Sequence, residues 1–277
     1  MLEIPEALTL AKQLNCTVRG KLILELEVTA GYSPHKFAWY HGDPSGYHDL
    51  LVGRKIGKTM AYGAMVEITS DDALILFGEG VSIRYHEQDE QRPLKHQLLI
   101  EFTDGSAISA SIRMYGGLWC FTNGDFDNHY YIIAKQKPSP LSEEFNMEYF
   151  ADLTDVPAMQ KLSVKAFLAT EQRVPGLGNG VLQDILYNAR IHPRRKMSTL
   201  TMLDTQSLFD SIKTTLAEMV ELGGRDIEKN LFGRPGGYQT KLSAKAHGKP
   251  CQQCGSIIQK ENYLGGSIYY CDVCQAL

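Results

Sequence analysis

The stretch Val174-Pro-Gly-Leu-Gly-Asn179 decides how the middle of this chain folds. Apolar residues at helical spacing lie on both sides of it, and Pro175 stops the preceding helix. The two glycines permit a tight turn before the next helical segment begins. The apolar stripes are Val164, Phe167 and Leu168 before the turn, and Val181, Leu182, Ile185, Leu186 and Ala189 after it. The stretch therefore predicts two helices joined by a short turn.

This turn supports two interpretations. Backbone N–H groups, an asparagine amide and a helix N-terminus meet at Gly178 and Asn179, which suits a phosphate. Alternatively, Asn179 is only a helix N-cap and the glycines only make the turn. Lys161 and Lys165 on the preceding helix favour the phosphate, as does the basic run at 194–196, although such runs are often solvated surface.

The N-terminal part of the chain has the alternating pattern of β-strands. Strands are predicted at 21–29, 65–68, 73–77, 81–85, 97–102 and 107–113. In the first of them Leu22, Leu24, Leu26 and Val28 share one face, and Ile23 is the exception. Asp104-Gly105 predicts a hairpin turn, and a helix with Pro5 in its first turn precedes all the strands.

These patterns predict an α+β multidomain protein with three regions. Residues 1–135 are expected to form an antiparallel β-sandwich led by a helix, 140–224 an all-helical domain, and 225–277 a cysteine-rich finger. The helical domain includes a third helix at about 204–222, which Gly223-Gly224 ends. More than one domain suits 277 residues, because single cores rarely grow beyond about 250.

Composition excludes several classes of protein. With 43% hydrophobic and 22% charged residues, the chain is typical of globular proteins and unlike disordered ones. The sequence contains neither an apolar run of about 18 residues nor a signal peptide, so we expect a cytoplasmic protein without membrane contact. Residues 161–277 carry 15 basic and 10 acidic side chains, against 13 and 22 in residues 1–160. A polyanionic partner is therefore expected on the C-terminal half.

Four of the six cysteines follow a metal-ligand spacing, Cys251-x2-Cys254-x16-Cys271-x2-Cys274. Two such pairs brought together by a hairpin offer four thiolates to one tetrahedral ion, which indicates a single structural zinc. Two disulfides or an iron–sulfur cluster are the alternatives. The hairpin strands are expected at 256–260 and 267–270.

Taken in order, these motifs resemble those of one enzyme family. They are Glu3-x-Pro5-Glu6, Pro140-Leu-Ser-x-x-Phe145, Pro175-Gly-Leu-Gly-Asn179, Ile191-His-Pro193 and the four-cysteine cluster. The whole chain is similar to the formamidopyrimidine-DNA glycosylase / endonuclease VIII family of base-excision repair enzymes. The resemblance implies an N-terminal β-sandwich, a helix–two-turn–helix domain and a zinc finger. In that family these parts grip duplex DNA, bend it and flip out a damaged nucleotide.

The resemblance also implies roles for individual residues. Asn179 and its turn match the family's phosphate-binding asparagine, and Lys165 and Lys161 fall where helical lysines contact the DNA backbone. Arg113 and Tyr115, within Arg-Met-Tyr-Gly, resemble the loop that fills the space left by the flipped base.

The sequence departs from the family at the residues that carry the chemistry. Family enzymes use the amine of an N-terminal proline to form a Schiff base with the sugar. Here Leu2 follows Met1, so the terminal amine is expected to belong to Met1 and to lie one residue out of place. The family's catalytic lysine aligns at Ala64, and Lys58 is the nearest alternative. The family's zinc-finger arginine aligns at Gly266. The methionine that helps to fill the space of the flipped base aligns at Glu79.

Glu3 and Glu6 remain as carboxylates at the N-terminus. In the family, the counterpart of Glu3 moves protons at the sugar, and that of Glu6 supports the site. A buried carboxylate there is able to activate water and release a base without the lyase step. The alternative is that both glutamates only interact with the dipole of the first helix.

Two hypotheses of function follow. The first is a divergent DNA glycosylase with a weak or absent lyase step, whose catalytic candidates are Glu3, Glu6 and Met1. The second is a non-catalytic protein that recognises damaged DNA, or another nucleic acid such as RNA, on the same scaffold. The expected partner is double-stranded DNA with a damaged or abasic nucleotide, bound by a monomer, and RNA is the alternative.

Overall fold

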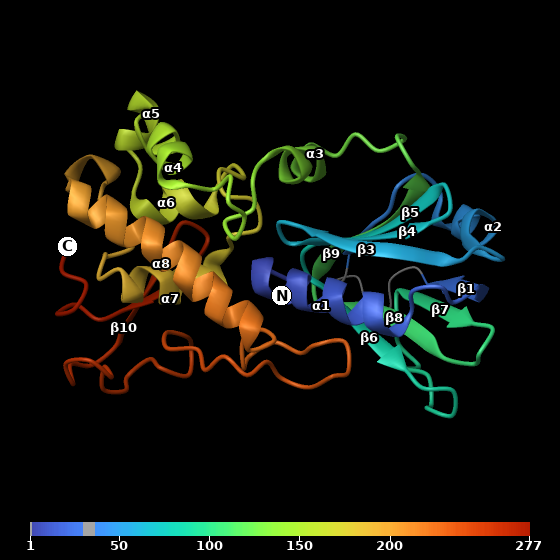
Figure 1. Cartoon of the computed structure of the whole chain (residues 1–277). Coiled ribbons are helices and arrows are strands. Elements are labelled where there is room, and N and C mark those ends of the chain that lie inside the picture. The colour runs from blue at the N-terminus through green and yellow to red at the C-terminus, as the bar shows by residue number, and fades with distance from the viewer. Residues whose placement is uncertain (1, 30–36) are drawn as a thin grey trace. The chain divides into compact units, whose positions relative to one another are not determined.

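The computed structural model describes residues 2–29 and 37–277. The chain forms two compact units, whose elements are labelled in Figure 1. One comprises Met1–Ile132 with Leu222–Gly237, and the other Ile133–Glu221 with Tyr238–Leu277. The segment Leu222–Gly237 thus packs with the N-terminal strands, although the sequence grouped most of it with the finger. Among the described residues, no helix is long and apolar enough to cross a membrane.

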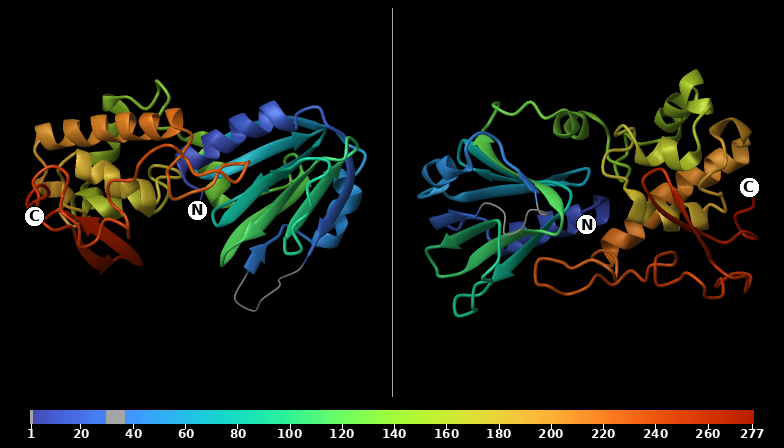
Figure 2. Two further views of the ribbon diagram at one scale, coloured as in Figure 1. Left: turned by 90° about the horizontal axis from the view of Figure 1, so that it is seen from below. Right: turned by 180° about the vertical axis from the view of Figure 1, so that it is seen from behind.

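The first unit is a β-sandwich, as the sequence predicted. One sheet has the strand order β1-β7-β8-β6 and the other β2-β9-β5-β4-β3, in which β2 runs parallel to β9. Figure 2 shows the two sheets facing each other. The strands are β1 (Ile23–Val28), β2 (Phe37–Trp39), β3 (Ile56–Tyr62), β4 (Met65–Ser70), β5 (Ala73–Phe77), β6 (Val81–His86), β7 (Leu98–Phe102), β8 (Ala107–Ile112) and β9 (Tyr115–Thr122). Two short helices, η1 (Pro44–Gly46) and α2 (Tyr47–Leu51), follow β2.

Apolar side chains fill the space between the sheets, and α1 (Ile4–Thr17) packs on β3 and β4. Ala7, Leu10 and Leu14 of α1 are buried in the same cluster as the strand residues. Pro5 stands in the first turn of α1, where a missing N–H group breaks no helical hydrogen bond. This packing fixes the start of the helix, and with it Glu3 and Glu6.

The first strand departs from its predicted alternation. A register shift between Ile23 and Glu25 interrupts the pairing of β1 with β7. As a result Ile23 is 1% exposed, whereas Leu24 is 56% exposed. The prediction that Leu24 faces the core is wrong, because a bulge adds one residue to the strand and reverses the alternation.

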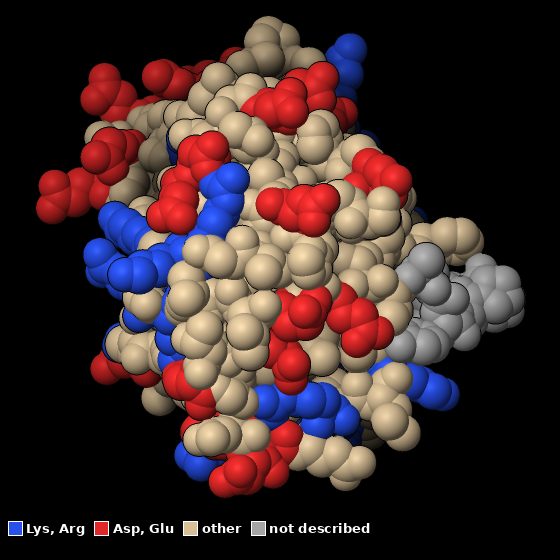
Figure 3. Space-filling view, turned by 90° about the vertical axis from the view of Figure 1, so that its right-hand side faces the viewer, with Lys and Arg blue, Asp and Glu red and all other residues tan. Residues whose placement is uncertain are grey.

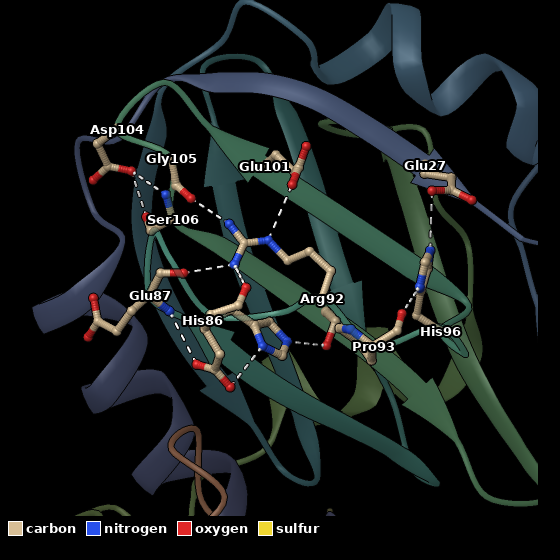
Figure 4. Close-up of polar contacts among 12 residues, drawn as sticks. Glu27, His86, Glu87, Arg92, Pro93, His96, Glu101, Asp104, Gly105 and Ser106 are labelled. Carbon is tan, nitrogen blue, oxygen red and sulfur yellow. Dashed lines mark hydrogen bonds and ion pairs between the residues drawn. The ribbon is translucent and has the colours of Figure 1, made fainter.

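The connection between β6 and β7 is held by Arg92 (Figure 4). Its Nη1 donates to the carbonyls of Glu87 at 2.8 Å and Glu90 at 2.7 Å. Its Nη2 donates to the carbonyl of Gly105, and its Nε to Oε1 of Glu101 at 3.2 Å. One guanidinium therefore ties the long loop to the β7–β8 turn.

The second unit contains the helix–turn–helix that the stretch at 174–179 predicted. Helices α6 (Val164–Ala169) and α7 (Asn179–Asn188) flank the turn, and α8 (Met202–Glu221) packs against α7. Ser163 caps α6 by accepting a hydrogen bond from the N–H of Ala166. The remaining elements are α3 (His129–Gln136), which leads in from the first unit, α4 (Met147–Thr154), α5 (Pro157–Gln160), η2 (Met197–Thr199), β10 (Gln259–Tyr263) and β11 (Gly266–Tyr270).

Candidate nucleic-acid interface and metal site

The four C-terminal cysteines are positioned to bind one metal ion. Their sulfur atoms lie within 4.8 Å of one another. The Sγ atoms of Cys251 and Cys274 are 3.8 Å apart, and those of Cys254 and Cys271 are 3.4 Å apart. A tetrahedral ion with metal–sulfur bonds of about 2.3 Å needs sulfurs about 3.8 Å apart. The four donors therefore fit a closed four-thiolate site.

Helix α7 reaches this cluster through Tyr187, which the sequence analysis did not single out. The Tyr187 hydroxyl lies 3.1 Å from Sγ of Cys251 and is buried. Burial raises the pKa of Tyr187 well above that of an ordinary phenol, so the hydroxyl keeps its proton and can donate a hydrogen bond to a thiolate sulfur. From the sequence, Tyr187 is only one more residue of an amphipathic helix.

The first turns of α7 hold the β10–β11 hairpin. Nδ2 of Asn179 and Nε2 of Gln183 both donate to the carbonyl of Ser267, at 2.9 and 3.1 Å. Oε1 of Gln183 accepts from the N–H of Tyr269 at 3.0 Å. Gly178 occupies the N-cap position of α7, without a side-chain cap among the described residues. The alternative interpretation of Asn179 as an N-cap is therefore wrong.

Lys165 contacts the same hairpin. Its Nζ donates to the carbonyl of Tyr263 at 2.6 Å, and the residue is 3% exposed. Burial lowers the pKa of Lys165. A Cβ built on Gly266 would lie 3.5 Å from the Asn179 amide and 3.6 Å from Nζ of Lys165. The two side chains predicted to bind phosphate thus meet at Gly266, the position at which the sequence led us to expect the family's arginine.

The basic run at 194–196 has partners inside the second unit. Arg195 pairs with Asp204 and Arg194 with Glu261, each at 2.7 Å. Nζ of Lys196 donates to the carbonyl of Lys161 at 3.1 Å, whereas the Lys161 side chain is exposed. The run therefore helps to hold its own unit together.

In the first unit, Glu3 and Glu6 share one buried guanidinium, that of Arg225. The three residues are 2%, 5% and 1% exposed, in that order. Nε and Nη2 of Arg225 bind the two carboxylate oxygens of Glu6 at 2.9 and 2.7 Å. Nη1 lies 3.4 Å from Oε2 of Glu3. Burial disfavours the charge on Arg225, but the two carboxylates outweigh this and raise its pKa, so the arginine stays cationic.

The turn that carries Arg225 depends on glycine. Gly224 has a φ of +98°. A Cβ on Gly236 would lie 2.1 Å from the carbonyl oxygen of Gly224, so the two backbones touch there. This turn also lets the N–H of Arg225 donate to Oε1 of Glu6 at 3.2 Å. The sequence pointed to Gly223-Gly224 only as a helix stop, and so missed Arg225.

The two loops predicted to fill the space of a flipped base lie side by side. A Cβ on Gly80 would lie 1.8 Å from the carbonyl oxygen of Tyr115, so the turn carrying Glu79 rests directly on the start of β9. The Tyr115 side chain is 40% exposed. The Arg113 side chain is 66% exposed and lies 3.7 Å from Glu228. Glu79 is exposed at the tip of its turn.

The positions that replace the family's other catalytic groups are spread over the first unit. Ala64 is buried in the β3–β4 turn, and Lys58 is exposed on β3. Leu2 is buried in the core of the sandwich. Met1, whose amine the sequence offered as a nucleophile, lies outside the described residues.

A cavity of about 380 Å³ in the first unit is lined in part by Glu6 and Arg113. It also contains a Ser–His–Glu chain, in which Nε2 of His86 is 2.8 Å from Oγ of Ser109 and Nδ1 is 3.4 Å from Oε1 of Glu90. Figure 4 shows His86 beside the Arg92 loop. Ser109 lies on β8, which pairs with β6 and β7 on its two sides, so its backbone N–H groups are not available to an oxyanion. We therefore assign the hydrogen-bonded set of Ser109, His86 and Glu90 to anchoring of the loop between β6 and β7.

Replacing Arg225 by methionine is expected to lower the free energy of unfolding by about 3–5 kcal/mol, since the buried carboxylates of Glu6 and Glu3 then lose the guanidinium that they share. Urea-induced unfolding measures the change. The control is Arg84→Met, because the pair of Arg84 with Glu90 is 51% and 35% exposed. Its loss is expected to cost less than about 1 kcal/mol. Equal losses for the two variants would contradict the assignment.

Tyr187→Phe is expected to lower metal affinity about 10- to 100-fold, because it removes the hydrogen bond to a ligand sulfur. Competition with a chromophoric chelator measures the affinity. Tyr269→Phe changes a half-buried tyrosine of the same hairpin and serves as the control. Unchanged affinity in Tyr187→Phe would show that the hydroxyl does not support the site.

Comparisons with known proteins agree with this architecture. The family model described as "Formamidopyrimidine-DNA glycosylase H2TH domain" matches residues 137–230. The chain is 30% identical to the formamidopyrimidine-DNA glycosylase of Bacillus licheniformis over 281 residues, 99% of each chain. It is 27% identical to that of Bacillus cereus over 283 residues, again 99% of each.

Solved structures extend the likeness to the whole fold. The Lactococcus lactis protein Fpg (MutM), in complex with DNA containing N7-benzyl-Fapy-dG, shares 26% identity at a TM-score of 0.84. The complex of Lactococcus lactis Fpg with DNA containing an abasic site shares 25% identity at a TM-score of 0.83. Both alignments cover 99% of this chain and 100% of the other. The chain belongs to the formamidopyrimidine-DNA glycosylase family.

Proposed function

We propose that this protein binds duplex DNA carrying a damaged or abasic nucleotide and acts in base-excision repair, as a monomer in the cytoplasm. Two of its solved relatives hold DNA with such a lesion, and the likeness covers 99% of this chain. The observation that carries the proposal is the meeting of Lys165, Asn179 and Gly266 where α7 contacts the hairpin.

A phosphate suits this meeting point for electrostatic reasons. Lys165 is bonded to a backbone carbonyl, which carries no full negative charge, and burial lowers its pKa. A phosphate there would stabilise the ammonium and would accept hydrogen bonds at the start of α7, around Gly178. We assign Lys165, Gly178 and Asn179 to one DNA phosphate, and the exposed Lys161 to the same strand.

The distribution of charge supports the same surface. Residues 161–277 have an excess of basic side chains, whereas residues 1–160 have an excess of acidic ones. Acidic side chains and groups of basic side chains are interspersed on the face shown in Figure 3. We assign the contact with the interior of the duplex to the exposed side chains of Arg113 and Tyr115.

For the chemistry, we assign base release to Glu3, supported by Glu6. Glu3 is a buried carboxylate held in place beside Arg225, and a carboxylate can serve as the base that activates water. The family's N-terminal proline is replaced, which leaves the amine of Met1 as the nucleophile for a lyase step. We therefore propose a lyase step that is weak or absent.

Recognition without chemistry is the second candidate function, and Arg225 favours it. Cleavage of a glycosidic bond builds positive charge on the sugar, which a nearby carboxylate stabilises. A buried cation 3.4 Å from Glu3 offsets that stabilisation. The same ion cluster thus holds Glu3 in place and weakens its effect on a cationic transition state.

For the metal site we infer one structural zinc ion. Cys251, Cys254, Cys271 and Cys274 supply four soft thiolates within 4.8 Å of one another, which is the donor set of closed zinc sites. Such an ion would supply much of the folding energy of the hairpin that carries the Lys165 and Asn179 contacts.

Lys165→Met and Asn179→Ala are each expected to weaken DNA binding about tenfold and equally for different sequences, because both contact phosphate. Fluorescence anisotropy with an abasic duplex, repeated at several salt concentrations, measures the affinity. For Lys165→Met the salt slope is expected to fall by about 1. Lys12→Ala, which changes an exposed lysine of α1, is the control. Normal binding by both variants would overturn the assignment.

The chemistry is tested on duplexes that carry an abasic site or an oxidised base, with base release and borohydride trapping scored together. We expect slow base release without a trapped adduct, and its loss in Glu3→Gln. Tight lesion binding without release would support the recognition candidate instead. A trapped adduct as abundant as that of a family enzyme would contradict the proposed loss of the lyase step.

A further inference from the structure

Four large apolar side chains are exposed together at one end of the five-stranded sheet. Phe37 and Trp39 of β2 are 60% and 52% exposed, and Met114 and Tyr115 at the start of β9 are 58% and 40% exposed. In the parallel pairing Phe37 lies opposite Tyr115, and the N–H of Phe37 donates to the carbonyl of Met114 at 2.9 Å. We call Phe37, Trp39 and Tyr115 the aromatic end of the sheet.

Farther along β9, other side chains cover the same face of the sheet, whereas the aromatic end is exposed. Alternate residues of β9 share a face, so Tyr115 lies on the same side as Trp119 and Phe121. The rings of Trp119 and Phe121 lie 5.4 and 4.4 Å from that of Phe126, and both residues are buried. Tyr115 and Trp39 instead contact each other, with ring centroids 5.5 Å apart at 43°, and stay exposed.

The arrangement around Trp39 depends on a glycine in the neighbouring strand β9. Gly117 lies opposite Trp39 in the register, and the Trp119 ring occupies the space where its side chain would be, with Cη2 1.9 Å from an ideal Cβ. Any larger residue at 117 would collide with that ring. The paired strands β2 and β9 therefore present Trp39 and Tyr115 as neighbouring rings.

The occupant that best matches these surfaces is a nucleobase. Arg113, whose side chain is 66% exposed and lies 3.7 Å from Glu228, starts the same turn as Tyr115 and places a guanidinium two residues from that ring. Aromatic rings stack on any base, because every base has a flat π face, and a neighbouring cation attracts the phosphate that comes with it. The aromatic end is also continuous with Arg113 and Tyr115, which are assigned above to the interior of the duplex.

We propose that Trp39, together with Tyr115, forms a stacking platform for a base that is unpaired next to the lesion. This inference rests on the proposed function. It adds Trp39 of β2, which is distant in the sequence from the loops that carry Glu79 and Arg113. Stacking is independent of base identity, so the platform would contribute to affinity for distorted DNA without selecting its sequence.

Tryptophan fluorescence tests the proposal directly, because the chain has two tryptophans and Trp119 is 8% exposed. In the variant Trp119→Phe, Trp39 is the sole emitter. An abasic duplex is expected to quench its emission and to protect it from iodide, and the same duplex without the lesion is expected to do so less. If Trp119→Phe does not fold, iodide quenching of the wild-type protein separates the exposed Trp39 from the buried Trp119.

Affinity supplies the second measurement. Trp39→Leu is expected to bind the abasic duplex about tenfold more weakly with an unchanged salt slope, whereas Trp39→Tyr keeps a stacking ring and most of the affinity. Tyr130→Leu, which removes a 52% exposed aromatic side chain from α3, is the control and is expected to bind like the wild type.

The outcomes separate this inference from the function on which it rests. Unquenched Trp39 emission, or normal binding by Trp39→Leu, would overturn the platform while the wild-type preference for the lesion stands. A change of oligomeric state in Trp39→Leu with unaltered DNA binding would assign the aromatic end to a protein contact and would also overturn it. A wild-type protein that shows no preference for the abasic duplex would instead refute the proposed function.

Discussion

The ion cluster of Arg225 with Glu3 and Glu6 is the constraint on which the first unit depends. Three charged side chains are removed from water there, and their mutual pairing offsets much of the cost of this burial. The cluster connects the start of α1 to the segment Leu222–Gly237, which is distant from α1 in the sequence but packs in the same unit. It therefore fixes the place of the two carboxylates and commits both of them to the same buried guanidinium.

Helix α7 plays the corresponding part in the second unit. Its first residue, Asn179, binds the hairpin tip, and Tyr187 in its last turn donates to a ligand sulfur. The metal site and the proposed phosphate site thus lie at opposite ends of one short helix. Metal binding stabilises the hairpin, and the hairpin carbonyls of Tyr263 and Ser267 orient Lys165 and Asn179. A metal bound by the four cysteines would therefore support the proposed DNA binding without itself contacting DNA.

Sequence reasoning recovered the elements whose pattern is local. The strands from β4 to β8, the helices around the 174–179 turn and the cysteine spacing all follow from periodicity or from ligand chemistry. It missed features that only tertiary packing creates. The bulge in β1 exposes Leu24, and β9 was overlooked because Gly116 and Gly117 interrupt its alternation. Arg225 looks like a surface residue in the sequence, since nothing local indicates that two glutamates about 220 positions away enclose it.

In the candidate site, too, the sequence indicated the residues but not their tertiary contacts. Motif order placed Lys165 and Asn179 together, and the structure shows which carbonyls hold them. The central claim is that this framework recognises lesions in DNA. Competition between an abasic duplex and its intact counterpart, over a range of salt concentrations, tests it most directly. We expect the abasic duplex to bind about tenfold more tightly than its intact counterpart, with steep and parallel salt slopes for the two duplexes. Equal affinity for the two duplexes at every salt concentration would contradict it.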